Sequence, residues 1–196
     1  MTKPAYITNL KKLGEDVLTK KDISNIEAEV YSGTDRASAV VLGSFVERSL
    51  ADLLAAKMNH SHIGKIFDFS GPLGTFSAKI DLAYAFNFIG PKSYHDLDLI
   101  RLLRNAFAHT RRAVSFQTPE VIDVCKYLKL PDEDGVTSET AIKTLLPAPH
   151  AEAALAKPPA RIRFFISCHE LQTRIIQAID GPQAGDRVYP NDQPLP

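Results

Sequence analysis

The residues best suited to chemistry lie in the stretch "LLRNAFAHTRR", from Leu102 to Arg112. Arg104 and Asn105 stand next to each other, His109 follows five positions after the arginine, and two more arginines close the stretch. These side chains allow two interpretations. Either the cations complete and anchor the end of a helix, or they form a small active site that cuts RNA.

The structural interpretation rests on the helix dipole. Basic groups in the last turn of a helix stabilise its negative end by roughly 0.3–1 kcal/mol each. The cations in suitable positions are Arg104, His109, Arg111 and Arg112. If Arg104 lies on the buried side, it also needs a carboxylate. We predict that Glu47 or Asp35, on an earlier helix, supplies it.

The catalytic interpretation rests on a resemblance. An Arg-Asn pair followed by His109 resembles the motif of the HEPN ribonucleases, all-α domains that dimerise around two such motifs. The resemblance implies that His109 acts as general base or acid on a ribose 2′-hydroxyl, while Arg104 holds phosphate charge and Asn105 positions the group, without a metal. Five helical steps separate Arg104 from His109 by roughly 140°, so they share a face only if the helix ends near Ala108.

Helices must position these residues, because helical spacing dominates the sequence and the strand signal is weak. Ile7 to Lys20 carries one apolar stripe and is predicted to be an amphipathic helix. Asp35 to Met58 is apolar on nearly every face, which is typical of a central buried helix. Either Thr34 or Asp35 can cap its first turn.

Two further helices follow, joined by a short turn. The first repeats Phe76, Ile80, Ala83 and Tyr84 at helical spacing, and Gly90-Pro91 ends it and starts the next. The second helix runs to His109 on an apolar face. The members of that face are Tyr94, Leu97, Ile100, Leu103 and Phe107. Pro119 then opens a shorter helix.

The last third of the chain changes character. Residues 131–159 are proline-rich, and we interpret them as an ordered excursion or lid in which only Ala141 to Leu146 can pack. A strong final helix follows, and 181–196 reads as a flexible tail. The predicted buried face of the final helix is Ile162, Phe165, Ile166, His169, Ile175, Ile176 and Ile179. We therefore predict an all-α fold, with one bundle of about six helices spanning residues 1–180.

Composition excludes several classes of function. Lys+Arg and Asp+Glu number 23 each, so the net charge is zero and the long-range field that draws proteins to nucleic acid is missing. Cys125 and Cys168 are too few for a disulfide framework or a zinc site, and we expect reduced core thiols. We find no secretory signal or membrane span, so we expect a soluble cytoplasmic protein.

Other candidate sites are weaker. The pair of helices from Phe76 to His109 could form a helix-turn-helix, but Asp96 and Asp98 in the first turns of the second helix would repel phosphates. "GPLGTFSAK", with Lys79, could bind an anion, although helix capping explains it better. His60-Ser61-His62 does not place both rings on one helical face, so we predict no metal site.

Four segments together resemble the mannitol operon repressor family, over about Asp35 to Val121. They are "TDRASAVVLGSFVERSLADLL", "FSGPLGTFSAKIDLAYAFNFI", "DLDLIRLLRNAFAH" and "VSFQTPEV". The resemblance implies an all-helical fold without its own DNA-binding domain, regulation through other proteins, and self-association. The proline-rich segment and the tail have no counterpart that we can assign.

We therefore expect a non-enzymatic regulator that binds another protein, forms a homo-oligomer and reads no DNA sequence directly. We expect no cofactor, and RNA enters only in the ribonuclease alternative. The working surface should lie near the end of the Tyr94 to His109 helix and the loop Thr110 to Pro119. The residues that we assign to structure or interaction are Asp35, Arg36, Glu47, Arg104, Asn105, His109, Arg111 and Arg112.

Overall fold

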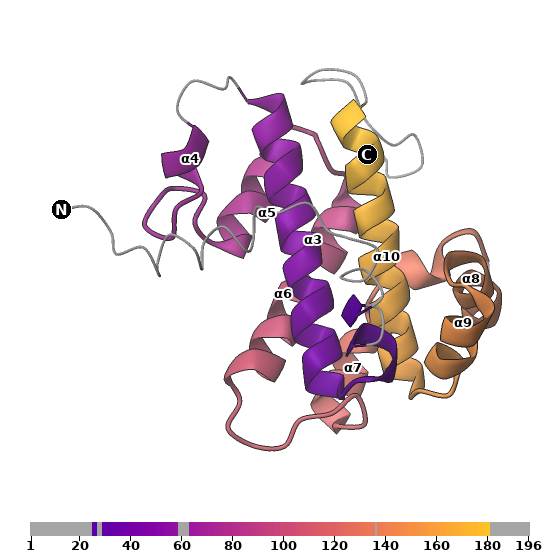
Figure 1. The fold of residues 1–196 in the computed structure, drawn as a ribbon. Coiled ribbons are helices and arrows are strands. Elements are labelled where there is room, and N and C mark those ends of the chain that lie inside the picture. Colours follow the sequence, from indigo (N-terminus) through magenta and orange to yellow (C-terminus); the bar gives the residue numbers. More distant parts are fainter. Residues whose placement is uncertain (1–24, 27–28, 59–62, 136, 181–196) are drawn as a thin grey trace.

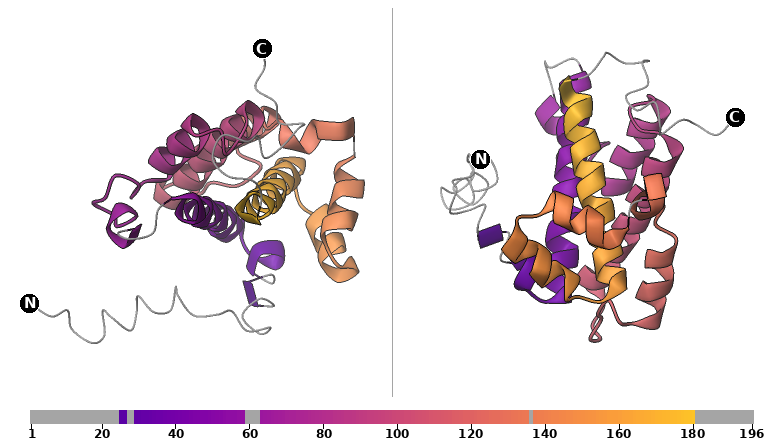
Figure 2. Two further views of the ribbon diagram at one scale, coloured as in Figure 1. Left: turned by 90° about the horizontal axis from the view of Figure 1, so that it is seen from above. Right: turned by 90° about the vertical axis from the view of Figure 1, so that its right-hand side faces the viewer.

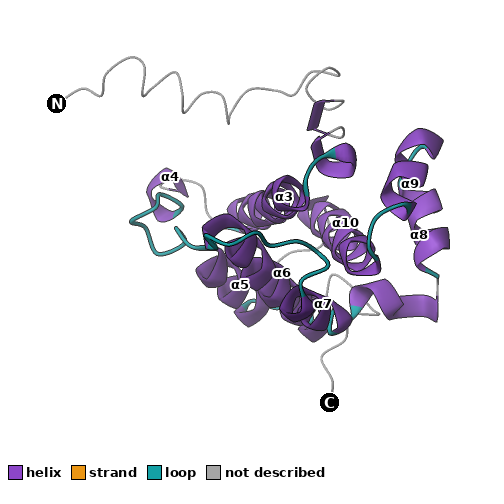
Figure 3. Cartoon of the chain, turned by 90° about the horizontal axis from the view of Figure 1, so that it is seen from below, coloured by secondary structure: helices purple, strands orange, loops and turns teal. Residues whose placement is uncertain are grey.

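The structure is a computed structural model that describes residues 25–26, 29–58, 63–135 and 137–180 (Figure 1). Within those ranges the secondary structure is helical, without a strand (Figure 3), which confirms the all-α prediction. The predicted helix over Ile7 to Lys20, the His60-Ser61-His62 sequence and the tail 181–196 lie outside the described residues.

The described ranges contain eight α-helices and one 3₁₀ helix, more than the six or so expected, because three short α-helices had no clear sequence signal. In chain order they are α3 (Asp35–Lys57), α4 (Ile63–Ile66), α5 (Phe76–Ala85), α6 (Pro91–His109), α7 (Pro119–Lys126), the 3₁₀ helix η2 (Leu130–Gly135), α8 (Ser138–Leu145), α9 (Ala148–Leu155) and α10 (Pro159–Asp180).

Helix α3 is central, as its apolar faces predict. It packs against α10 on one side and against α5 and α6 on the other (Figures 1 and 2). Its first turn is capped by Thr34, whose hydroxyl accepts a hydrogen bond from Ala37 N at 3.2 Å. Such a cap contributes about 1 kcal/mol to helix stability. Thr34 rather than Asp35 therefore caps the helix, which leaves the Asp35 carboxylate for a different partner.

The α5–α6 pair forms as predicted. Thr75 caps α5 by accepting a hydrogen bond from Ala78 N at 3.2 Å. In the turn that follows, Asn87 adopts a left-handed conformation with φ of 56°, which asparagine tolerates better than most residues. Gly90 then caps α6 and Pro91 occupies its first turn. The turn sends α6 back along α5, and both lie against α3.

A chain of three buried phenylalanine rings joins α6 to α10 through the loop after α6. The ring of Phe116, in the loop, lies 4.8 Å from Phe107 on α6 and 5.4 Å from Phe164 on α10, measured between centroids. All three side chains are fully buried. Burial of each contributes about 1.5–3 kcal/mol, so the loop is part of the core rather than a surface excursion.

The proline-rich segment is more regular than the sequence indicates. It forms η2, α8 and α9, and α8 packs on α10, on the side away from α5 and α6 (Figure 3). Ile142 and Leu146 are buried, as predicted, but Ala151 and Ala154 of α9 are buried too. The prolines fit because several occupy helix starts, where the missing N–H has no partner to lose.

Two residues assigned to buried faces are exposed. Ile176 on α10 is 56% exposed, whereas Ile175 beside it is buried. Successive helical positions differ by about 100°, so only one of the two can face the bundle. Tyr84 on α5 is 38% exposed, and its ring packs against that of Tyr94 in a tilted arrangement with centroids 4.6 Å apart. The predicted apolar faces of α5 and α10 therefore each included one residue that does not face the core.

Candidate functional site

The final turns of α6 carry the Arg-Asn-His residues. Helix α6 continues through His109. The condition for Arg104 and His109 to share a face is therefore not met, and roughly 140° separates their directions. Arg104 is mostly buried and Asn105 partly buried, whereas His109 is exposed. Within one chain, these side chains do not form a shared cleft.

Arg104 lies in the interface between α6, α3 and α5. Its guanidinium group donates a hydrogen bond to Glu47 on α3 and lies 5.6 Å from the centroid of the Phe76 ring. Gly43 permits this approach, because a Cβ there would lie 2.8 Å from the Arg104 Cβ and Cγ atoms. The predicted partner Glu47 is therefore present, and Arg104 Nε is buried without an acceptor among the described residues.

Glu47 binds a second cation that the sequence analysis did not assign to it. Lys79 on α5 donates to Glu47 Oε1 at 2.7 Å, and its side chain is only 8% exposed. The lysine of "GPLGTFSAK" is therefore engaged inside the chain, and Thr75 in the same sequence caps α5. This favours the capping interpretation of that sequence over the anion site. One carboxylate thus holds α3, α5 and α6 together.

Asp35 pairs with a residue that sequence reasoning missed. Its Oδ1 accepts a hydrogen bond from Arg161 Nη1 on α10 at 2.7 Å, and its Oδ2 accepts one from Phe116 N at 2.9 Å. The other terminal nitrogen of Arg161 donates to the Ser38 hydroxyl at 2.6 Å and to backbone carbonyls just before α3. Two arginines in the otherwise apolar start of the final helix, Arg161 and Arg163, were the available signal.

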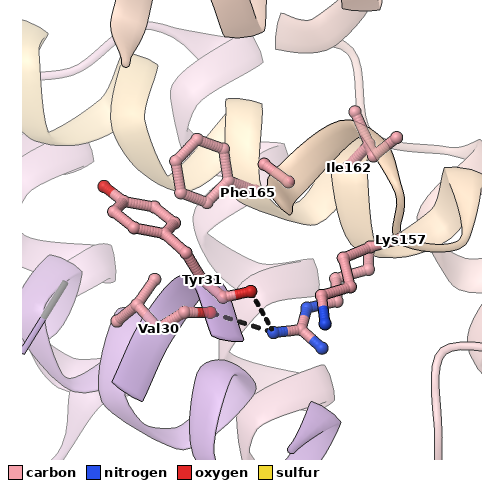
Figure 4. Close-up of a pocket in the computed structure, with 7 residues that line it drawn as sticks. Val30, Tyr31, Lys157, Ile162 and Phe165 are labelled. Atoms are coloured by element: carbon pink, nitrogen blue, oxygen red, sulfur yellow. Dashed lines mark hydrogen bonds between the residues drawn. The ribbon is translucent and has the colours of Figure 1, made fainter. Parts of the chain in front are cut away.

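Figure 4 shows the carbonyl groups of Val30 and Tyr31 hydrogen-bonded to this guanidinium group. The pocket beside it, also lined by Lys157, Ile162 and Phe165, has a volume of only about 10 Å³. A cavity of this size holds about one water molecule. The pocket therefore has no room for a small-molecule substrate, and Arg161 serves to join the start of α3 to α10.

Backbone contacts fix the loop after α6. Arg36, in the first turn of α3, donates hydrogen bonds from Nη2 to the carbonyl oxygens of Thr110 at 3.0 Å and Arg112 at 3.1 Å. Further along, Asp35 holds Phe116 N and the Phe116 ring is buried. Two neighbouring residues of α3 thus hold the loop near its start and near its end.

Three basic residues lie on the outside, at the end of α6 and on this loop. His109, Arg111 and Arg112 are exposed, and their side chains form no ion pair or hydrogen bond within the described part of the chain. They occupy the surface where we predicted the working face. Their part in binding is still a prediction at this point.

Asp96 is not where the sequence analysis expected it. The side chain is fully buried and accepts hydrogen bonds from Lys129 N at 2.8 Å, Leu130 N at 3.0 Å and the Ser167 hydroxyl at 2.8 Å. The prediction that it would repel DNA phosphates was therefore wrong. Of the two aspartates, Asp98 is exposed, and it pairs with Arg101 at 2.6 Å. Asp96 instead joins α6 to η2 and α10.

The two cysteines are buried and free, as predicted. Burial raises the pKa of the Cys125 thiol to about 12 and raises that of Cys168 well above its ordinary value. Both are therefore thiols rather than reactive thiolates at neutral pH. The described residues contain no group of three or more His, Cys, Asp or Glu that could hold a metal ion. Within the same residues, no helix has the length and apolarity needed to span a bilayer.

Comparison with known proteins gives one informative result. No family model and no curated protein matches this sequence. A solved chain described as "X-ray structure of the MtlR-HPr complex from Escherichia coli" matches with a TM-score of 0.55 and 18% identity, over 78% of this chain and 96% of that chain. At this identity the match establishes a shared fold. Nothing in the comparisons points to the HEPN ribonucleases.

Proposed function

We propose that this chain is a transcriptional regulator of the mannitol operon repressor type that lacks its own DNA-binding domain and acts by binding another protein. The observation that carries the proposal is the shared fold, which extends over 96% of a chain from a complex of MtlR with HPr. That solved structure is a protein–protein complex. The sequence resemblance to the mannitol operon repressor family points the same way.

The charges of the bundle support binding rather than catalysis. The arginine of the Arg-Asn pair, Arg104, is engaged by Glu47 between helices. His109 points in a different direction and is exposed. A general base must come within hydrogen-bond reach of the group that it deprotonates, beside a group that stabilises the developing charge. No observation on the described residues assembles such a pair, so we keep the ribonuclease only as an outcome of the tests.

We place the contact surface at the end of α6 and in the loop that follows, where exposed cations gather. We further propose that the protein acts in the cytoplasm, that it self-associates, and that residues 1–180 form its one folded domain. The proposal does not include sequence-selective DNA binding. Of the two aspartates that were expected to repel DNA phosphates, Asp96 is buried and no longer supports this exclusion.

Titration calorimetry with HPr, the protein named in the solved complex, tests the proposal directly. We expect a saturable complex that also co-elutes in size-exclusion chromatography. If HPr produces neither heat nor co-elution, the proposed kind of partner is wrong. Tight, sequence-selective binding in a gel-shift assay at physiological salt would contradict the absence of direct DNA reading.

A separate assay addresses the ribonuclease. The protein is incubated with labelled RNA in EDTA, with His109→Ala as the variant and Arg48→Ala, at an exposed position on α3 away from this surface, as the control. We expect no cleavage by any of the three proteins. Cleavage that leaves cyclic phosphates, and that only His109→Ala abolishes, would replace the regulator by an enzyme.

A further inference from the structure

Many charged side chains of this molecule are paired within the described part of the chain, but those of the loop after α6 are not. Salt bridges hold arginine or lysine side chains of α3, α5, α6, α7, α8 and α10 to carboxylates of the same chain. His109, Arg111 and Arg112 have no such partner within the described residues. Arg111 and Arg112 therefore give this loop a local excess of positive charge, in a chain whose formal net charge is zero.

Within the described residues, no acidic side chain forms an ion pair with Arg111 or Arg112. Asp35, the carboxylate that reaches the loop, is engaged by Arg161 at 2.7 Å and by Phe116 N at 2.9 Å. Glu120, the next acidic residue along the chain, is exposed and lies beyond the loop in the first turn of α7. The positive charge of Arg111 and Arg112 is therefore not cancelled where it stands.

The backbone that carries these cations is already ordered. Arg36 binds two carbonyl oxygens of the loop, at Thr110 and Arg112, and the buried ring of Phe116 anchors the far end. A surface that is ordered before binding loses less conformational entropy when a partner arrives. Arg36 is itself exposed and adds a fourth cation to the same place.

We propose that the surface formed by Arg36, His109, Arg111 and Arg112 binds an acidic face of a partner protein. The inference rests on the proposed function, in that the partner is a protein, and it adds the chemistry of the contact. Complementary charge across an interface speeds encounter and selects among partners more than it adds raw affinity. A guanidinium group also forms bidentate hydrogen bonds with a carboxylate, which favours arginine over lysine at such a contact.

The observations favour an acidic protein over a nucleic acid. Nucleic acids are held by many phosphate contacts along a track of positive charge. Here the excess is confined to one loop and the first turn of α3, in a chain whose net charge is zero. The carboxylates of a compact acidic patch match the extent of this surface better than a long phosphate backbone does. RNA binding is therefore the rival outcome of the test.

The experiment uses the full chain and a labelled oligoglutamate peptide, followed by fluorescence anisotropy over a series of salt concentrations. The test variant is Arg111→Glu/Arg112→Glu, because these side chains have no contact to lose in the described structure. The matched control is Arg48→Glu/Lys143→Glu, which makes the same change of charge at exposed positions on α3 and α8. Circular dichroism confirms that both variants are folded.

We expect the wild type to bind the peptide at low salt and to release it as salt rises. Binding should weaken by at least about tenfold in the loop variant and change little in the control. An equal loss in both variants, or no binding by the wild type, overturns the inference. A single-stranded oligouridylate of equal length, bound more tightly than the peptide, also overturns it.

The HPr titration separates this inference from the proposed function. If HPr binds the chain but the peptide result fails, the proposed function stands and the acidic-partner inference is wrong. If the peptide result holds but HPr does not bind, the inference stands and the proposed kind of partner is wrong. Should the double loop variant not fold, Arg112→Gln alone gives the same comparison with a smaller expected change.

Discussion

Two pairs of arginines differ in what surrounds them. Arg104 reaches from α6 to Glu47, between three helices, and Arg161 binds Asp35 and the backbone before α3. Arg111 and Arg112 lie outside, with no partner in the described part of the chain. The difference teaches that the residue type does not decide the role. A partly buried carboxylate of the same chain makes an arginine a structural element, and without such a carboxylate the charge stays available to another molecule.

The largest effect is expected for Arg161→Ala. It removes the partner of Asp35 and the donor to Ser38 and the carbonyl groups before α3. Loss of one partner of a buried ion pair costs about 3–5 kcal/mol. Urea denaturation should show this decrease in the free energy of unfolding. A loss below about 1 kcal/mol is typical of surface substitutions and would contradict the structural role of Arg161.

Asp96→Ala extends the comparison to a buried anion. It leaves two backbone N–H groups and the Ser167 hydroxyl without their acceptor, at a combined cost of about 3–4 kcal/mol. Asp98→Ala is the matched control, because Asp98 is two residues away on α6 and exposed. We expect that control to change the free energy of unfolding by less than about 0.5 kcal/mol. Similar losses in both variants would contradict the structural role of Asp96.

The comparison also includes one side chain inside the bundle, His169, whose contribution to stability depends on pH. Burial lowers the pKa of its ring from 6.5 to about 4. The unfolded chain then binds the proton more readily, so the contribution of His169 is complete above pH 6.5 and is lost as pH falls toward 4. The loss approaches about 3 kcal/mol. Denaturation of the wild type and of His169→Leu at several pH values measures it, and parallel curves for the two proteins would show that the pKa is not lowered.

Arg104→Ala and Arg112→Ala compare the two groups most directly. Arg104→Ala should lower the free energy of unfolding by about 2 kcal/mol, less than for Arg161, because Glu47 keeps Lys79 and the site is partly exposed. Arg112→Ala should change it by less than about 0.5 kcal/mol. Thermal melts of the two variants give the ranking. Equal melting temperatures would remove the distinction between them.

Sequence reasoning predicted the parts of the fold that depend on local pattern. The central helix and the Gly90-Pro91 boundary follow from spacing and residue type, and so does a carboxylate partner for Arg104, which was predicted to be either Glu47 or Asp35. Asp96 was missed because two of its partners are backbone N–H groups, which every residue but proline has and which therefore leave no signal.

Contacts between distant segments were the other limit. Asp35 and Arg161 are far apart in the chain, and each could have paired with several other residues of opposite charge. Helix α9 was missed because short alanine-rich segments with prolines show no clear periodicity, and its buried residues have small side chains. The exposed basic residues of the working surface were predicted. Arg36 was included among the residues assigned to structure or interaction, but its hydrogen bonds to the backbone of the loop were not predicted.

The grip of Arg36 on the loop has an evolutionary consequence. Arg36 binds the carbonyl oxygens of Thr110 and Arg112, which every amino acid has, so these hydrogen bonds do not depend on the side chains of the loop. Substitutions at positions 111 and 112 can therefore change which partner the surface binds, while the backbone of the loop keeps its conformation. Descendants of this protein could exchange one partner for another without first redesigning the bundle.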